Sequence, residues 1–364
     1  MCLKTQKVVM KVTNDCNLSC KYCYIEKIVL RNRIISVDTV KRLFDELEIH
    51  STMPKIWLRW HGGEPLLANI DFFREVVDFQ KEYKKEYVNS IQTNGTLLSE
   101  EFARFFKENS FEIGLSLDGP KILNDSARVF SSGKGSFDKV VKKMLILNRL
   151  KVPFKVLSTI SKINVKNAKD LYAFCKEHEL PLKFSLLYLS GDARDNVDLL
   201  SVSPDEYSEF LIELTEIWMN DPSPIEIETL ELYLGNVLEH GKHPTLCNFG
   251  TKCHEGFLAI GPSGDLYPCS PFQGYTEYRY GNIHEISLAD IHYTPVWEKL
   301  EKRVDYINKV CSNCSIKEYC NGGCPFNAFA HYNTIERKDY FCNMYKTVIP
   351  ALLEIVKKKI KETS

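Results

Sequence analysis

The amino-acid sequence predicts an α/β fold, in which a partial barrel of six β/α units is followed by a smaller, cysteine-rich α+β domain. Two observations predict it. Short β-branched runs alternate with amphipathic helical patterns up to about residue 235, and eight of the 13 cysteines gather after residue 236. Such alternation is typical of parallel strands joined by helices. We therefore expect two domains, residues 1–235 and residues 236–364.

The expected barrel elements follow one another along the chain. The apolar runs that we interpret as strands are Val8–Val12, Ile56–Trp60, Ser90–Thr93, Ile113–Leu117, Phe154–Ile160 and Lys183–Leu189. Stretches between them repeat apolar residues at helical spacing, as at Val40, Leu43 and Leu47. A later helix is expected to begin at Ser203, because a proline follows this serine and Glu206 completes a capping-box pattern.

The cysteine-rich domain is expected to contain a hairpin and a terminal helix. Residues 256–260 and 266–269 are apolar runs, and the turn between them contains glycine and proline. Residues 349–364 place apolar residues before a group of lysines. This pattern predicts a packed helix with a solvated end.

Composition excludes several classes of partner. With 364 residues, 44% of them hydrophobic, the chain is long enough to bury a large core. Because 47 basic and 48 acidic residues nearly cancel and no basic tract occurs, we expect no nucleic-acid partner. No signal-peptide pattern and no long apolar run is present, so we expect no membrane association and a cytoplasmic location. A reducing cytosol keeps cysteines available for metals.

Three cysteines near the start are the most informative feature of the chain. Cys16, Cys20 and Cys23 lie within the run T-N-D-C-N-L-S-C-K-Y-C-Y, with no fourth ligand nearby. A four-iron cluster held by three thiolates keeps one iron open, so it can bind a small molecule and pass it an electron. A zinc site completed by a distant cysteine or histidine is the alternative. Measuring iron, sulfide and zinc separates the two.

Polar residues follow the expected strands at the edge where parallel α/β barrels build their sites. They form the segments His61-Gly62-Gly63-Glu64-Pro65, Gln92-Thr93-Asn94-Gly95, Ser116 to Gly119, and Ser158-Thr159. Taken alone, each segment is typical of an ordinary turn after a strand. Together they offer backbone carbonyls for an ammonium, Thr93 and Asn94 for a carboxylate, and Ser116 and Asp118 for ribose hydroxyls. A ligand that carries all three groups is an amino-acid nucleoside.

At this point the chain resembles the radical S-adenosylmethionine (SAM) enzymes over roughly residues 5–235. The resemblance rests on the cysteine spacing, on Tyr22 before the third cysteine, on G-G-E-P after the second strand and on S-L-D-G after the fourth. It implies that SAM chelates the open iron of a [4Fe-4S] cluster and that its reductive cleavage gives a 5′-deoxyadenosyl radical. This radical abstracts a substrate hydrogen, which makes Cys16, Cys20 and Cys23 the catalytic cluster ligands.

The same resemblance implies a SAM-binding set. Gly62, Gly63 and Glu64 would surround the methionyl amino group, Ser116 and Asp118 the ribose, and Tyr22 the adenine. Further lining residues would be Gln92, Asn94, Arg128 and Thr159. In such a site the cofactor carries the chemistry, and the protein positions its reactive carbon.

The eight later cysteines resemble the SPASM extension of anaerobic sulfatase-maturing enzymes and ribosomal-peptide maturases. The ligands implied for the nearer auxiliary cluster are Cys247, Cys253, Cys269 and Cys324, and those for the farther cluster are Cys311, Cys314, Cys320 and Cys342. Three [4Fe-4S] clusters would give about twelve iron atoms per chain. Zinc knuckles are the alternative for these eight residues, and they would leave about four iron atoms and two zinc ions.

The sequence therefore predicts a radical SAM enzyme that abstracts hydrogen from a residue of a ribosomally made peptide or protein, followed by oxidation or crosslinking. The expected electron donor is a flavodoxin or ferredoxin. The alternative is an anaerobic sulfatase-maturing enzyme, which makes formylglycine from cysteine or serine. By family pattern an aspartate base follows the third auxiliary cysteine, where this chain has Ser270, so Asp265, Glu255 and Tyr24 are the candidate bases. A non-catalytic metal scaffold, the third possibility, would form no 5′-deoxyadenosine.

Overall fold

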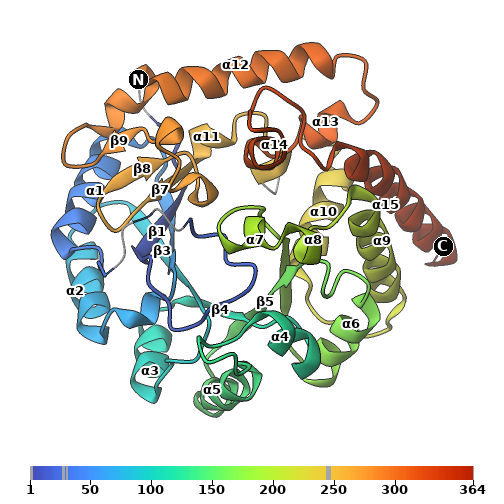
Figure 1. The fold of residues 1–364 in the computed structure, drawn as a ribbon, viewed down its shortest axis with the longest axis horizontal. Coiled ribbons are helices and arrows are strands. Elements are labelled where there is room, and N and C mark those ends of the chain that lie inside the picture. Colours follow the sequence, from blue (N-terminus) through green and yellow to red (C-terminus); the bar gives the residue numbers. More distant parts are fainter. Residues whose placement is uncertain (1–2, 27–28, 30–31, 243–246, 364) are drawn as a thin grey trace. The chain divides into compact units, whose positions relative to one another are not determined.

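The computed structural model describes residues 3–26, 29, 32–242 and 247–363, and it divides into two compact units (Figure 1). The first unit comprises Met1–Ser116, Arg128–Phe154 and His254–Glu301. The second comprises Leu117–Ala127, Lys155–Cys253 and Lys302–Ser364. Because each unit is built from three chain segments, neither coincides with a single sequence domain. The boundary expected near residue 236 stays a prediction.

Seven strands of the first unit are joined in the order β4-β3-β2-β1-β7-β8-β9. β1 to β4 and β7 run parallel to one another, whereas β8 pairs antiparallel with both β7 and β9. The β7–β8 pair is the expected hairpin, and β7 adds it to the edge of β1. The strands are β1 (Lys7–Thr13), β2 (Lys55–Gly62), β3 (Glu86–Thr93), β4 (Glu112–Ser116), β7 (Phe257–Ile260), β8 (Asp265–Tyr267) and β9 (Gly281–Asn282).

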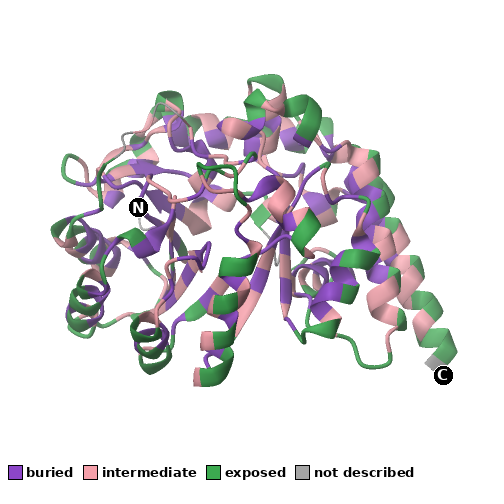
Figure 2. Cartoon of the chain, turned by 60° about the horizontal axis from the view of Figure 1, so that its bottom comes forward, coloured by how far each residue is buried: buried purple, intermediate pink, exposed green. Residues whose placement is uncertain are grey.

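Helices of the first unit cover the apolar face of its parallel strands. The ring of Trp60, which is fully buried on β2, packs edge to face against Phe72 and Phe73 at 6.0 and 5.8 Å between centroids. In Figure 2, buried residues lie on the sides of the helices that face the strands. The helices are α1 (Val37–His50), α2 (Ile70–Gln80), α3 (Glu100–Glu108) and α5 (Phe137–Leu150). Later in the chain, α11 (Cys253–Gly256) and α12 (Pro295–Val310) each include residues of both units.

The second unit is mainly helical around a parallel pair of strands. β5 (Phe154–Ile160) pairs with β6 (Leu182–Leu186), and Phe184 of β6 packs edge to face on Phe210. Its helices are α4 (Lys121–Ala127), α6 (Ala168–Glu177), α7 (Asp192–Asp195), α8 (Val197–Leu200), α9 (Pro204–Asn220), α10 (Glu228–Leu238), α13 (Lys317–Cys320), α14 (Pro325–Tyr332) and α15 (Cys342–Thr363). In the described part of the chain, no helix combines the length and apolar character that crossing a membrane requires.

The capping box expected at Ser203 is confirmed. The Ser203 Oγ atom accepts from the Glu206 N–H at 3.1 Å, and the Glu206 carboxylate accepts from the Ser203 N–H at 2.9 Å. We expect Ser203→Ala to lower the free energy of unfolding by about 1 kcal/mol, because one N–H of α9 loses its acceptor. Chemical denaturation measures this change. The exposed Ser223 is the control, and an equal loss for Ser223→Ala would contradict the capping explanation.

Candidate active site

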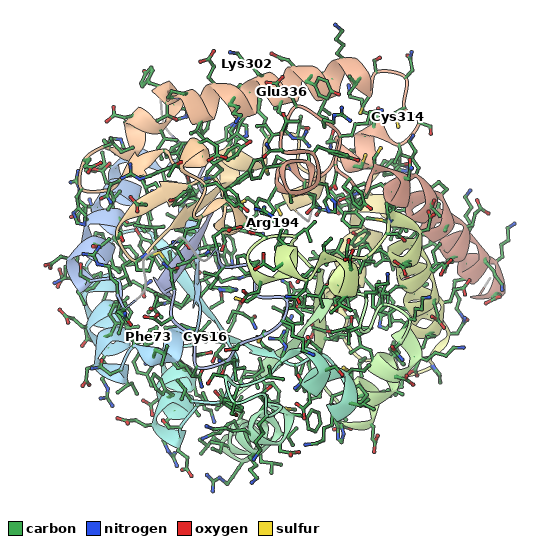
Figure 3. All side chains as sticks on the ribbon, in the orientation of Figure 1. Cys16, Phe73, Arg194, Lys302, Cys314 and Glu336 are labelled. Carbon is green, nitrogen blue, oxygen red and sulfur yellow. The ribbon has the colours of Figure 1, made fainter. Side chains whose placement is uncertain are left out.

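The three cysteines of the first motif lie on the loop that follows β1, and their side chains are partly buried (Figure 3 labels Cys16). The Leu18 N–H donates to the Cys16 Sγ atom at 3.4 Å, and the Cys23 N–H donates to the Cys20 carbonyl at 3.0 Å. Among the described residues, no three Cys, His, Asp or Glu side chains converge closely enough to hold a single metal ion. Thiols carried by one loop are nevertheless the donor type that iron–sulfur clusters take.

Two glycines fasten the end of β2 to this cysteine loop. Gly62 has a φ angle of +126°, and a Cβ atom there would lie 2.1 Å from the Thr13 carbonyl oxygen. A Cβ atom on Gly63 would lie 2.1 Å from the Asp15 carbonyl oxygen. The Gly63 N–H donates to the Thr13 carbonyl at 2.8 Å, and the next N–H donates to the Asp15 carbonyl at 2.9 Å. Only glycine permits so close an approach of the two backbones.

The Glu64 side chain is fully buried and is used inside the protein. Its Oε1 atom accepts from the Thr93 hydroxyl at 2.6 Å and from the Leu66 N–H at 3.0 Å, and its Oε2 atom accepts from the Asn94 N–H at 2.7 Å. The Asn94 amide in turn donates to the Cys16 Sγ atom at 3.6 Å. Glu64 therefore positions a residue that contacts the first cysteine, which leaves its backbone as the part that can face a ligand.

Burial raises the pKa of Glu64 to about 7, although its three hydrogen bonds act in the opposite direction. A carboxyl whose pKa is higher in the folded than in the unfolded state binds its proton more tightly when folded. Below about pH 4.5 this group makes its full contribution to the free energy of unfolding. As the pH rises toward about 7, the free energy of unfolding falls by roughly 3 kcal/mol because this contribution is lost. Glu64→Gln should remove this slope from the stability profile. Unfolding measured between about pH 5 and 7 tests it, and an unchanged slope would contradict the prediction.

Two more pairs of predicted lining residues meet in the first unit. The Arg128 guanidinium carbon lies 5.2 Å from the centre of the Tyr22 ring, a cation–π distance. The Gln92 amide donates to the Ser116 hydroxyl at 3.0 Å. These contacts bring Tyr22 and Arg128 together at one place and Gln92 and Ser116 at another.

The other two predicted lining residues belong to the second unit. The Asp118 Oδ1 atom accepts from the Thr159 N–H at 2.9 Å, so this carboxylate joins β5 to the segment before α4. The Asp118 N–H also donates to the Asn124 side chain at 3.3 Å. Asp118 and Thr159 are therefore neighbours, as their shared place in the expected site requires.

Four cysteines of the second unit gather after α12. Burial raises the pKa of the Cys320 thiol to about 12, and the Cys342, Cys314 and Cys311 thiolates lie close enough to add to this effect. Figure 3 labels Cys314, which lies between α12 and α13. These are the four residues implied for the farther auxiliary cluster. Of the other four, Cys247, Cys253 and Cys324 lie in the second unit and Cys269 in the first.

Arg303 and Asp339, which sequence reasoning missed, hold the loop around Cys324. The Arg303 guanidinium is 5% exposed and donates to the carbonyls of Gly322, Gly323, Ile335 and Arg337. The Asp339 carboxylate accepts from the Cys324 N–H at 2.8 Å and from the Tyr345 hydroxyl at 3.1 Å. Burial raises the pKa of Asp339. No local pattern marks these two residues.

Comparisons with known proteins identify the family to which this chain belongs. The model of the radical SAM superfamily matches residues 10–177, and that of an iron–sulfur cluster-binding domain, SPASM, matches residues 247–315. The chain is 31% identical to a cysteine-type anaerobic sulfatase-maturating enzyme of Clostridium novyi, over 95% of this chain and 94% of the relative. The chain belongs to the radical SAM superfamily. It is also 30% identical to a serine-type anaerobic sulfatase-maturating enzyme of Bacteroides thetaiotaomicron, over 93% of this chain and 87% of the relative.

Solved structures support the fold of this radical SAM enzyme. Native anSMEcpe with bound AdoMet aligns with a TM-score of 0.85 and 25% identity, over 98% of this chain and 99% of the other. Streptococcus suis SuiB bound to S-adenosylmethionine, at 17% identity and a TM-score of 0.68, shares the fold. The predicted α/β fold class with a SPASM domain is thereby confirmed. The radical SAM domain binds SAM and a [4Fe-4S] cluster, and the SPASM domain binds auxiliary iron–sulfur clusters.

The candidate bases of this radical SAM enzyme differ in their surroundings. Asp265 accepts from Arg279 at 2.7 Å and from Asn282 at 3.0 Å, and Glu255 pairs with Lys4 at 3.3 Å. The Tyr24 hydroxyl shares a hydrogen bond of 2.8 Å with the Ser270 hydroxyl. Burial raises the pKa of Tyr24, so this phenol keeps its proton at neutral pH.

Proposed function

We propose that this radical SAM enzyme oxidises a cysteine or serine residue of a peptide or protein to formylglycine. The observation that carries this proposal is the similarity, over nearly the whole chain, to anaerobic sulfatase-maturating enzymes of both the cysteine and the serine type. The chain is nearly as similar to the serine-type relative (30% identical) as to the cysteine-type relative (31% identical). We therefore include both cysteine and serine as possible substrate residues. Of the two functions expected from the sequence, this more specific one is therefore the better supported.

The proposed site takes its residues from the contacts described above. The cluster that binds SAM would be ligated by Cys16, Cys20 and Cys23. These cysteines lie on the loop whose backbone packs against Gly62 and Gly63. SAM, when bound, supplies the group that takes a hydrogen atom from the substrate. The lining residues remain Tyr22, Gly62, Gly63, Glu64, Gln92, Asn94, Ser116, Asp118, Arg128 and Thr159, and the other ligand sets remain those that the SPASM resemblance implies. A flavodoxin or ferredoxin would deliver the electrons.

Peptide crosslinking is the second candidate function. Ser270, rather than an aspartate, follows Cys269, and it bonds to Tyr24. This departure from the maturase pattern favours an enzyme whose substrate residue is not the sulfatase cysteine or serine.

The test uses anaerobically prepared, iron-loaded protein with SAM, dithionite and short peptides that contain one cysteine or one serine. We expect 5′-deoxyadenosine together with an aldehyde on the peptide, detected by mass spectrometry and by hydrazide labelling. A peptide without cysteine and serine is the control. Formation of 5′-deoxyadenosine without any aldehyde, across both peptides, would overturn the formylglycine proposal, and an intramolecular bond in the peptide would support crosslinking instead.

A further inference from the structure

A lysine is buried in the middle of β1. Lys11 lies between Met10 and Val12, and its side chain is 1% exposed. It is in register with His61 on β2, and the pair Val9–Arg59 precedes it on the same face of the sheet. Among the described residues, Lys11 has no hydrogen bond and no ion pair; its Nζ atom lies 5.0 Å from the centre of the Tyr24 ring.

This burial is costly for a purely structural residue. Removing an ammonium from water costs several kcal/mol unless a carboxylate or several acceptors compensate for it. A methionine would fill the same space between Met10 and Val12 without this cost. Buried lysines respond by titrating at lower pH, which is why they serve as bases in enzymes. A role in the reaction therefore explains the burial of Lys11 better than a role in stabilising the fold does.

Among the residues that the structure describes, the charged groups that act on Lys11 are two cysteine thiolates, not a carboxylate. Burial lowers the pKa of Lys11 to about 7, whereas the Cys23 and Cys269 thiolates act in the opposite direction. On β2, the His61 Nδ1 atom accepts from the Gly62 N–H at 2.7 Å, and burial together with Lys11 and Arg59 lowers the pKa of His61 to about 3. Arg59 cannot give up its proton. Of Lys11, His61 and Arg59, Lys11 is therefore the group best suited to accept one.

Tyr24 connects Lys11 to both cysteine-bearing loops of the first unit. Tyr24 directly follows Cys23, and its hydroxyl bonds to Ser270, which directly follows Cys269. Its ring lies beneath the Lys11 ammonium and beside His61, at 6.3 Å between ring centroids. An amine held here is close to the proposed SAM cluster ligand Cys23 and to the proposed auxiliary ligand Cys269.

We propose that Lys11 accepts the proton that the substrate residue loses when it is oxidised. The inference rests on the proposed function. For a peptidyl cysteine, one hydrogen atom leaves the β-carbon for the 5′-deoxyadenosyl group, the thiol proton moves to the Lys11 Nζ atom, and one electron passes to an oxidised auxiliary cluster. A carbon–sulfur double bond forms as the C–H and S–H bonds break. Hydrolysis of this thioaldehyde gives formylglycine and hydrogen sulfide.

The first test compares Lys11→Met with Lys11→Arg, and uses Lys7→Met as the matched control on the same strand. Lys7 is exposed and lies over the Phe257 ring. Arginine keeps the charge but cannot act as a base. We expect both Lys11 variants to lose product formation by about 100-fold or more, the usual contribution of a general base. The 5′-deoxyadenosine yield, the iron content and the peptide Kd, measured by fluorescence anisotropy, should stay at the wild-type level.

The second test is chemical rescue of Lys11→Ala with a series of small alkylamines. We expect the rate of product formation to rise with amine concentration and to depend on the amine pKa, whereas guanidinium gives no rescue. Wild-type product from Lys11→Arg, rescue by guanidinium, or loss of iron from Lys11→Met would each overturn the proposal. Failure of the proposed function looks different, because the wild-type enzyme would then form no aldehyde.

Discussion

Replacing Cys16, Cys20 and Cys23 together by alanine is expected to abolish the cleavage of SAM. With the three clusters proposed above, the variant would lose one of them, so its iron content should fall from about twelve to about eight atoms per chain. The remaining cysteines keep their iron because they lie on other segments, four of them gathered after α12. Chromatographic detection of 5′-deoxyadenosine and an iron assay of the anaerobic protein measure the two effects.

Cys175→Ala is the matched control for this triple variant. Cys175 is fully buried on α6, away from both cysteine motifs in the sequence. It should keep the wild-type iron content and SAM cleavage. Residual 5′-deoxyadenosine from the triple variant, above that of protein without iron, would show that the open cluster lies elsewhere.

Arg303→Met is expected to have the largest effect on stability. Methionine fills the space of the side chain, but three buried carbonyls and that of Arg337 lose their donors, and the Asp339 carboxylate loses a nearby positive charge. Breaking a buried charged network of this kind costs about 3–5 kcal/mol. Because the loop at 322–324 carries Cys324, the variant should also lose auxiliary iron. Thermal unfolding by circular dichroism and an iron assay measure the two losses.

Lys309→Met tests whether the effect is specific to the buried guanidinium. Lys309 is exposed near the end of the same helix, α12, and its substitution removes an equal charge from the protein. It should leave both the melting temperature and the iron content unchanged. An Arg303→Met variant that has the melting temperature of the wild type and retains all its iron would disprove the structural role given to this arginine.

The strands and the first motif were predictable because their signals are local. Each predicted strand lies on an observed one, and Phe154–Ile160 coincides with β5. The largest difference is β3, which begins at Glu86 rather than Ser90, because Glu86 and Asn89 flank its first apolar residues and leave no apolar run. The cysteine spacing likewise needs no tertiary information. Local patterns therefore identify the elements and predict which loop binds a metal cluster.

The residues that sequence reasoning missed depend on distant partners. Arg303 donates to carbonyls 19 to 34 positions later in the chain, so no window of sequence reveals its burial. Lys11 could have been suspected as a charge inside the run V-V-M-K-V-T, but its lack of a carboxylate neighbour appears only in three dimensions. Glu64 was expected near a ligand, and this stays a prediction; its side-chain bonds to Thr93 and Asn94, 29 and 30 positions away, are what the sequence did not reveal.

The close contact of Gly62 and Gly63 with Thr13 and Asp15 has a consequence for how the protein matures. The backbone that presents the first cysteine is held by main-chain bonds to β2, which exist without any inorganic partner. Insertion of iron and sulfide thus meets a loop whose entropy has already been lost during folding. The metal-free polypeptide should accept its cluster after folding is complete, as a late assembly step rather than as the nucleus of the fold.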